Sequence, residues 1–179
     1  MINSFFKSTS LTLLILLCSA RLVAQEKSVQ DLEFLIGTWQ VREDIKDRNW
    51  WEESTRIANY TLDSTFIEID ASSRSSTGKE RTYRWFIHLN DKTQQFEMVS
   101  MFSNWHKVQF DLLDWNPETR KLTIRHAPDP SSEEYHERFG EMIFSDDFSS
   151  YEWKGENKYG DPDDPGIWRY VEKGVRAQE

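Results

Sequence analysis

The chain has 179 residues, about the length of one domain, and 14% of them are aromatic, which is enough large apolar surface for a substantial core. These values exclude an intrinsically disordered chain. The formal charge of −9 at pH 7 makes nucleic acid and anionic membrane surfaces poor candidate partners, because both recruit basic patches. We interpret the acidity as a source of solubility.

Residues 1–24 have the layout of a secretory signal. Lys7 supplies a positive charge, residues 11–17 form an apolar run, and small residues lead up to Ala24. The apolar run is shorter than the roughly 20 residues of a permanent membrane-spanning helix, so we expect no stable membrane span. We therefore predict cleavage after Ala24 and an exported protein, periplasmic or secreted, with one domain over residues 25–179.

An alternative for the same segment is a lipoprotein signal that attaches lipid to Cys18, the only cysteine. Leu17 precedes Cys18 where such a signal has a small residue, which favours plain cleavage. Cleavage would also remove Lys7 and Arg21 but no acid, so the formal charge would move from −9 to −11. A mature chain without cysteine has to be stabilised by its core alone, because no disulfide is available.

After the signal, apolar and polar residues alternate in short runs separated by turn-forming residues, which is typical of an all-β meander. The exception is the segment 29–36, whose apolar spacing fits one or two helical turns ending at Gly37. The run 160–166, rich in Gly, Pro and Asp, is predicted to be an exposed loop. Strands are predicted over 38–45, 54–62, 65–73, 79–89, 95–103, 107–114, 121–126, 135–144, 150–157 and 167–172.

About ten consecutive strands with short connections leave two sheet edges to protect, and closing the sheet into a barrel removes both. The fold class is therefore predicted as all-β, with a single closed antiparallel up-and-down barrel and a short N-terminal helical turn. The interior of such a barrel can enclose a small ligand.

The segment Leu32–Trp39 resembles the opening of calycin-type barrels, in which a helical turn leads into Gly-x-Trp at the start of the first strand. Lipocalins, fatty-acid-binding proteins, nitrobindins and bacterial lipocalin-like barrels share this opening, and the hairpin Tyr83–Phe102 resembles the bacterial group most. The resemblance implies that Gly37 and Trp39 form the barrel floor. It also implies an arginine stacked on Trp39, for which Arg169 is the candidate.

The chain also departs from these families. Residues 46–53 are too short for the helical pair of fatty-acid-binding proteins, and no C-terminal helix is apparent, so we transfer no ligand specificity. Nitrobindins hold haem through a histidine near the C-terminus, whereas the last histidine here is His136 and the closing strands carry Trp153 and Trp168 instead. We therefore expect no haem and no other cofactor.

The search for catalytic motifs returns little. The four histidines show no metal-type pair spacing, and there is no Gly-x-Ser-x-Gly elbow or phosphate-binding glycine loop. We predict no metal site and no catalytic residue. The histidines are His88, His106, His126 and His136.

Several strand residues are candidates for contact with a ligand, because alternate residues of a barrel strand point inward. An inward polar group needs a partner, which can be a side chain, water or a ligand. The sequence leaves open which face is inside, and an outward, solvated position is the alternative for each. The candidates are Arg84, Phe86, His88, Met98, Ser100, Phe110, Tyr135, Glu137 and Trp153.

Three functions remain open at this stage. The favoured one is an exported, noncatalytic protein that holds a small apolar or amphipathic molecule in its barrel. The second is a cavity enzyme, such as an isomerase, cyclase or hydrolase, that uses His88 or His106 with a carboxylate. A purely structural role is the third. A histidine and an acid within hydrogen-bond reach in a cavity would favour the enzyme.

Overall fold

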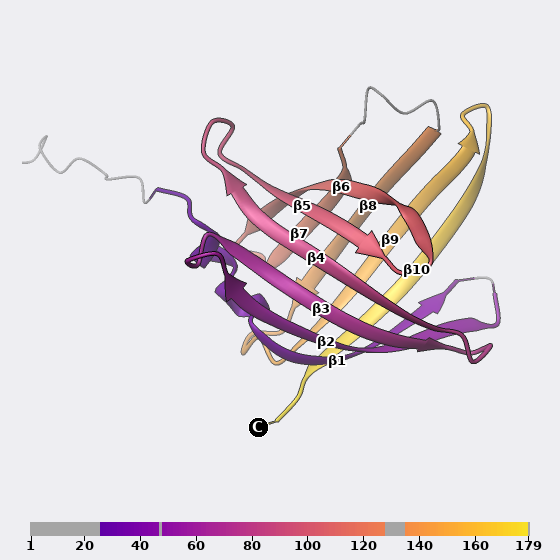
Figure 1. Cartoon of the computed structure of the whole chain (residues 1–179), viewed down its shortest axis with the longest axis horizontal. Helices are drawn as coiled ribbons and strands as arrows, with labels where there is room; N and C mark the ends of the chain where they lie inside the picture. Colours follow the sequence, from indigo (N-terminus) through magenta and orange to yellow (C-terminus); the bar gives the residue numbers. More distant parts are fainter. Residues whose placement is uncertain (1–25, 47, 128–134, 179) are drawn as a thin grey trace, which may run out of the picture.

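Residues 26–46, 48–127 and 135–178 are described by a computed structural model of the chain. They form ten antiparallel strands that pair in chain order, and the last strand pairs with the first, so the sheet closes into a barrel (Figure 1). A short 3-10 helix precedes the first strand. The predicted fold class is therefore confirmed. The predicted signal, including Cys18 and Ala24, lies outside the described residues.

Because the last strand pairs with the first, the closed sheet leaves neither a first nor a last edge strand unpaired. The elements are η1 (Val29–Leu35), β1 (Gly37–Ile45), β2 (Trp50–Thr61), β3 (Phe66–Ser75), β4 (Glu80–Asn90), β5 (Gln95–Phe102), β6 (Trp105–Asn116), β7 (Lys121–His126), β8 (Tyr135–Phe144), β9 (Ser150–Asp161) and β10 (Asp164–Arg176).

The structure settles which face of each strand is inside. In β4, Tyr83, Trp85 and Ile87 are buried in the core, whereas Arg84 between them is exposed. The same alternation runs through the neighbouring strands, as expected for a sheet with one face on a core and one in water. The sequence could not decide this point in β4, because large side chains occupy both of its faces.

The hairpin between β9 and β10 is longer than predicted. Both strands extend into the run 160–166, so its prediction as a loop is wrong for most of its length, whereas its predicted exposure is confirmed at every position except Pro165. Pro165 pairs with Gly160 in this ladder. The pairing of β10 with β1 ends at Tyr170, so one edge of β10 is unpaired around Pro165. Proline is tolerated at such an edge, because it cannot donate a backbone hydrogen bond.

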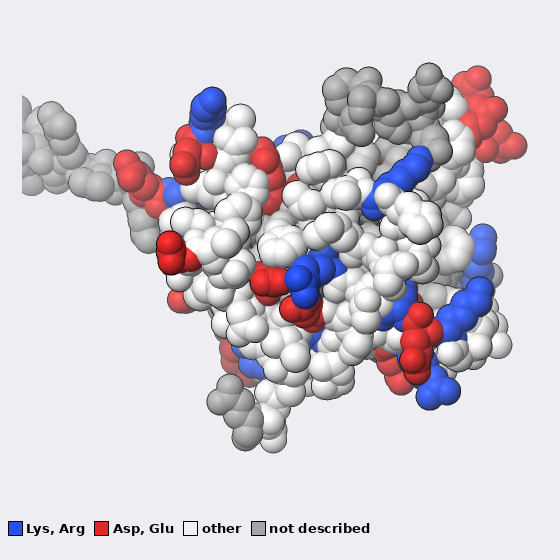
Figure 2. All heavy atoms as spheres, viewed as in Figure 1, with Lys and Arg blue, Asp and Glu red and all other residues white. Residues whose placement is uncertain are grey.

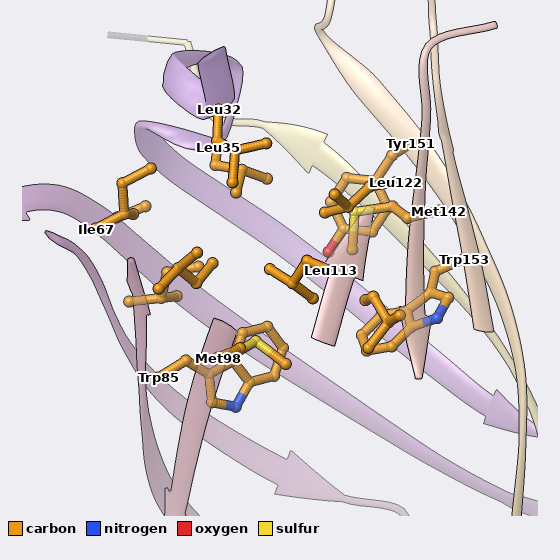
Figure 3. Packing of buried hydrophobic residues seen from close by; sticks show 14 of the residues in the cluster. Leu32, Leu35, Ile67, Trp85, Met98, Leu113, Leu122, Met142, Tyr151 and Trp153 are labelled. Atoms are coloured by element: carbon orange, nitrogen blue, oxygen red, sulfur yellow. The ribbon is translucent and has the colours of Figure 1, made fainter. Parts of the chain in front are cut away.

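Helix η1 closes one end of the barrel. Leu32 is completely buried, and Figure 3 shows Leu32 and Leu35 pointing from the helix into the interior. Phe34 packs against Trp115 and Phe148, with ring centres 4.1 and 5.3 Å apart. The helical segment predicted from its apolar spacing therefore acts as an apolar plug.

Trp39 lies at this closed end, where its indole N–H donates to the Leu35 carbonyl at 2.9 Å. The arginine that covers its ring is Arg176, whose guanidinium lies 4.5 Å from the ring centre. The predicted pair of Trp39 and Arg169 is wrong: Arg169 points outward and bonds Glu156 at 2.7 Å. Since side chains alternate along a strand, residues separated by an odd number of positions, as these arginines are, face opposite sides.

Gly37 is required beside this arginine. Its φ of +122° is a conformation that L side chains rarely adopt, and a Cβ there would lie 2.7 Å from Nη1 of Arg176. Arg176 donates to the carbonyl of Ile36 and, at 2.7 Å, to that of Phe34. The glycine therefore leaves room for the side chain that ties η1 to β10.

Candidate ligand-binding site

The other end of the barrel is hollow. A cavity of about 500 Å³ lies there, lined by inward side chains of β1, β2, β4, β5, β6, β8, β9 and β10 and by Asn104 in the turn between β5 and β6. Its volume is within the range of small-molecule sites in proteins. Glu43 lines the cavity near the far end of β1, six residues beyond Gly37 at the plugged end. The strands thus place the plug and the cavity at opposite ends.

Aromatic rings form much of the cavity wall. Trp50 and Trp168 meet edge to face at 6.3 Å near the mouth, and Trp85 and Trp153 meet in the same way at 6.2 Å deeper inside. Figure 3 shows the latter two rings projecting into the interior from opposite walls. Such rings present broad apolar faces together with a polar N–H edge.

Glycines in β8 and β9 make room for these rings. A Cβ at Gly155 would lie 2.2 Å from the ring of Tyr170, and a Cβ at Gly140 would lie 2.2 Å from Nε1 of Trp153. Both glycines occupy inward positions and pair with each other across the ladder. Without side chains of their own, they let aromatic rings from the neighbouring strands lie flat against the barrel wall.

The main polar cluster in the cavity is centred on Arg56. Its two terminal nitrogens bond the two oxygens of Glu172 at 2.7 and 2.5 Å, and its Nε donates to Tyr83 at 2.8 Å. Tyr151 donates to Glu172 at 2.8 Å. Burial alone would lower the pKa of Arg56, but the interactions with Glu172, Tyr151 and Tyr83 together outweigh it and hold this pKa well above its ordinary value. Arg56 therefore stays positively charged.

Two further ion pairs flank the cavity. Arg81 bonds Glu52 at 2.7 and 3.0 Å, and Arg138 bonds the buried Asp111 at 2.7 Å. Burial would raise the pKa of Asp111, but Arg138 and hydrogen bonds from its neighbours lower it below the ordinary value. The guanidinium of Arg138 also lies 5.1 Å from the ring centre of Trp153.

Glu43 differs from these carboxylates. It lines the cavity, and among the described residues it takes part in no ion pair or hydrogen bond. Burial and the negative charge of Glu172 raise the pKa of Glu43 to about 7, although Arg81 and Arg56 act in the opposite direction. At neutral pH this carboxyl therefore exists in both its protonated and its ionised form.

Some buried polar atoms of the lining have no hydrogen-bond partner within the described protein. They are Nε1 of Trp85, Nε of Arg138, Nε1 of Trp153, Oδ1 of Asn157 and the hydroxyl of Tyr170. Buried donors and acceptors of this kind are costly unless something bonds them. A molecule in the cavity, either ligand or water, can supply such bonds.

The structure divides the predicted ligand contacts. Trp153 lines the cavity, and its contact with a ligand stays a prediction. Met98 and Ser100 point inward and are buried, but they do not line the cavity. The remaining candidates lie on the outer face of their strands, which is the alternative that the sequence left open, so they do not face the cavity: Arg84, Phe86, His88, Phe110, Tyr135 and Glu137.

These outward residues have partners on the barrel surface. Arg84 bonds Asp70 at 2.6 Å, and Lys158 bonds Glu137 at 3.1 Å. Phe110 is 47% exposed. On the face shown in Figure 2, basic and acidic side chains are mixed and do not form a single-sign patch.

Histidines and metals contribute little to the site. Among the described residues, no histidine lines the cavity, and no group of three potential ligands could hold a metal ion. His126 lies 3.7 Å from Asp111, and its ring packs at a tilt against that of His136, with the ring centres 4.1 Å apart. Burial and His126 lower the pKa of His136 to about 4.

None of the helices in the described part of the chain has the length and hydropathy to cross a membrane.

The structure is a closed, ten-stranded antiparallel barrel with a cavity at one end. The structure is similar to that of an S-type phycobiliprotein lyase from Guillardia theta, with 10% identity, a TM-score of 0.58, and coverage of 85% of this chain and 94% of that one. Two barrels bound to DFHBI, mFAP2b and the redesigned mFAP1, match with TM-scores of 0.44 and 0.40 at 12% and 14% identity. They cover 82% and 81% of this chain and 96% of each of theirs. No protein-family model and no curated protein matches the sequence.

Proposed function

We propose that this protein binds an amphipathic small molecule in the cavity at the open end of its barrel. The observation that carries the proposal is the cavity itself, with about 500 Å³ of space between aromatic walls and buried polar atoms that have no partner. Aromatic faces suit a flat apolar body, and a few fixed polar groups suit one polar end. The S-type lyase has the same fold, and its low identity supports the architecture only.

The proposal includes export. Cleavage after Ala24 would release a mature chain beginning at Gln25, which N-terminal sequencing of the exported protein would detect. An intact start, or a start at a lipidated Cys18, would contradict it. We also propose that the bacterial lipocalin-like barrels are the relatives of this chain, on the strength of the Gly37-x-Trp39 opening.

Native mass spectrometry of the mature protein, purified from its own source, tests the proposal most directly. We expect a retained molecule of several hundred daltons that is lost on denaturation. A second test is titration with N-phenyl-1-naphthylamine, a neutral dye whose fluorescence rises in apolar surroundings. We expect saturable binding of one dye per barrel. The proposal is refuted if the protein retains no such molecule and the dye does not bind saturably.

Adjacent tryptophans in β2 provide a matched control for the dye experiment. Trp50 lines the cavity, whereas Trp51 lies on the outer face beneath the guanidinium of Arg42. Trp50→Leu should weaken dye binding by about fivefold, and Trp51→Leu should leave it unchanged. Equal effects of the two substitutions would place the dye outside the cavity.

An enzymatic role is the second candidate, and Glu43 is the observation that favours it. A cavity carboxyl with a pKa of about 7 is suited to general acid–base chemistry at neutral pH. The predicted partnership of His88 or His106 with a carboxylate does not occur in the cavity, because neither residue lines it. The two functions separate if the retained molecule is incubated with fresh protein. Unchanged mass and chromatographic retention time together indicate binding alone, and a change in either one indicates catalysis, because isomerisation alters retention without altering mass.

A further inference from the structure

The charges around the cavity do not balance. Each of three guanidiniums at its wall is already bonded to a carboxylate of its own, at distances of 2.7 Å or less. Glu43 is a fourth carboxyl, and no cation pairs with it in the described residues. The three pairs are Arg56 with Glu172, Arg81 with Glu52 and Arg138 with Asp111.

Arg56, at the centre of the polar cluster, has little capacity left for an anionic ligand. Arg56 donates to Tyr83, Tyr151 and both oxygens of Glu172, so all three nitrogens of its guanidinium are already bonded to protein groups. A ligand carboxylate that bonded Arg56 would have to displace one of these buried bonds and would also meet the negative charge of Glu43. Such a displacement is costly in a desolvated site. Nε of Arg138 has no hydrogen-bond partner in the described protein, but an anion bonded to it would be repelled by Asp111, with which Arg138 already pairs.

We infer that the cavity selects ligands with a positively charged polar end, such as a protonated amine, and that the Glu43 carboxylate is the counter-ion of this charge. The inference rests on the proposed binding function and specifies its substrate class. It follows from the position of Glu43: a charge at the cavity wall without a partner in the protein can be matched from the cavity alone.

The aromatic walls of the cavity also favour a cationic ligand. The faces of aromatic rings attract cations, and the protein already uses this attraction at the cavity, where Arg56 lies 4.7 Å from the ring centre of Trp85. At the mouth, the guanidinium of Arg48 lies 4.3 Å from the ring centre of Trp168. A cationic ligand would therefore meet both an unpaired carboxylate and rings that stabilise positive charge.

The binding should depend on pH through Glu43. The charged groups that act on it are Glu172 from β10 and Glu52 from β2, which raise its pKa, and Arg81 and Arg56 from β4 and β2, which lower it. A cation binds the ionised form, so it lowers the pKa of Glu43 and drives off any proton held there. Near pH 7, binding should release roughly half a proton per ligand, because the free carboxyl is about half protonated.

Three probes with one ring system and different end charges test the inference by isothermal titration calorimetry. They are 2-(1-naphthyl)ethylamine, 2-(1-naphthyl)ethanol and 1-naphthylacetic acid, which are cationic, neutral and anionic at pH 8. We expect the amine to bind about tenfold more tightly than the alcohol, and the acid most weakly. The affinity for the amine should fall roughly tenfold from pH 8 to pH 6, whereas that for the alcohol should not change.

Glu43→Gln should abolish the preference for the amine, its pH dependence and the proton release, which appears as a dependence of the binding enthalpy on the buffer. Affinity for the alcohol should be retained. Asp44→Asn is the matched control, because Asp44 is the next residue of β1 but faces outward, where it pairs with Arg42. This variant should behave like the wild type.

The outcomes separate the inference from the proposed function. If the alcohol binds in a Trp50-dependent manner but the amine binds no better, or if Glu43→Gln keeps the preference, the inference fails and the binding function stands. If none of the three probes binds, both are overturned. Tighter binding of the acid than of the amine would reverse the sign of the proposed selectivity.

Discussion

The two ends of this barrel obey the same alternation rule but are filled in different ways. At the plugged end, Leu32, Phe34 and Trp39 pack into a continuous apolar core beneath η1. At the open end, the inward positions carry arginines, carboxylates and widely spaced rings around a cavity. The comparison teaches that strand geometry decides only which residues point inward. The chemical nature of those residues decides whether the interior is solid or hollow.

The energetic roles of the two ends should differ accordingly. Burial of apolar side chains stabilises the folded state roughly in proportion to the area removed from water. Buried ion pairs contribute little net stability, because desolvation offsets most of their attraction. We therefore expect the plugged end to hold the fold together and the open end to determine what binds. The following predictions test this separation.

Trp39→Ala should have the largest effect on stability. The side chain is 3% exposed and is enclosed by Arg176 and Tyr151, so its removal leaves a large void. We expect a loss of about 4 to 5 kcal/mol in the free energy of unfolding, measured by urea denaturation. Dye affinity of the folded fraction should be unaltered. A variant that keeps its full stability would show that the plugged end is not the stabilising region.

Arg56→Met should cost about 3 kcal/mol, because it leaves Glu172 buried without a counter-ion. The double variant with Glu172→Met should recover most of this loss, since two apolar side chains of similar size leave no buried charge. Urea denaturation of both variants measures the difference. If single and double variants are equally destabilised, the ion pair itself stabilises the open end.

Glu43→Gln should show a pH-dependent effect on stability. Because the folded-state pKa of about 7 exceeds the ordinary value of 4.5, ionisation of Glu43 opposes folding, and stability is lost as the pH rises through this interval. The Glu43→Gln variant has no carboxyl to ionise, so it does not lose this stability as the pH rises. Its advantage over the wild type should be roughly 2 kcal/mol greater at pH 8 than at pH 5. A constant difference between urea midpoints at the two pH values would argue against a raised pKa.

The two arginines of β10 give the smallest and most selective comparison. Arg176→Met removes the guanidinium over Trp39 and its bonds to η1, and we expect a loss of about 1 to 2 kcal/mol. Arg169→Met removes an exposed pair with Glu156 and should change stability by less than about 0.5 kcal/mol. Thermal melts of the two variants check this. If Arg169→Met were the more destabilising of the two substitutions, the result would favour the pairing of Trp39 with Arg169 that the sequence predicts.

The fold was predictable because its signal is repeated in every strand. Period-two alternation and turn chemistry recur along the chain, so an error at one strand end, such as Pro165, does not change the topology. The barrel floor was also predictable, because Gly37 and Trp39 are spaced as in the Gly-x-Trp opening of calycin-type barrels. Both observations depend on residues that are close together in the sequence.

The site was less predictable because it depends on which face is inside and on partners far apart in the chain. Trp39 offered a usable signal: if it points inward, then Glu43, four positions further along the same strand, must also point inward. In β4 no such anchor exists, because large side chains occupy both faces, and the sequence therefore leaves the face of Arg84 open. The pairing of Arg56 with Glu172 spans 116 positions and leaves no trace in local patterns.

The contact of Arg176 with the carbonyl of Phe34 joins positions 142 residues apart. The seam between β1 and β10 can therefore form only after nearly the whole domain has been synthesised. Such distant pairings carry a large loop-closure entropy and slow the folding of β proteins. Until the seam closes, β1 and β10 are free edges open to pairing with other chains. Removal of the last few residues, including Arg176, should therefore promote aggregation during refolding more strongly than it reduces the stability of the finished barrel.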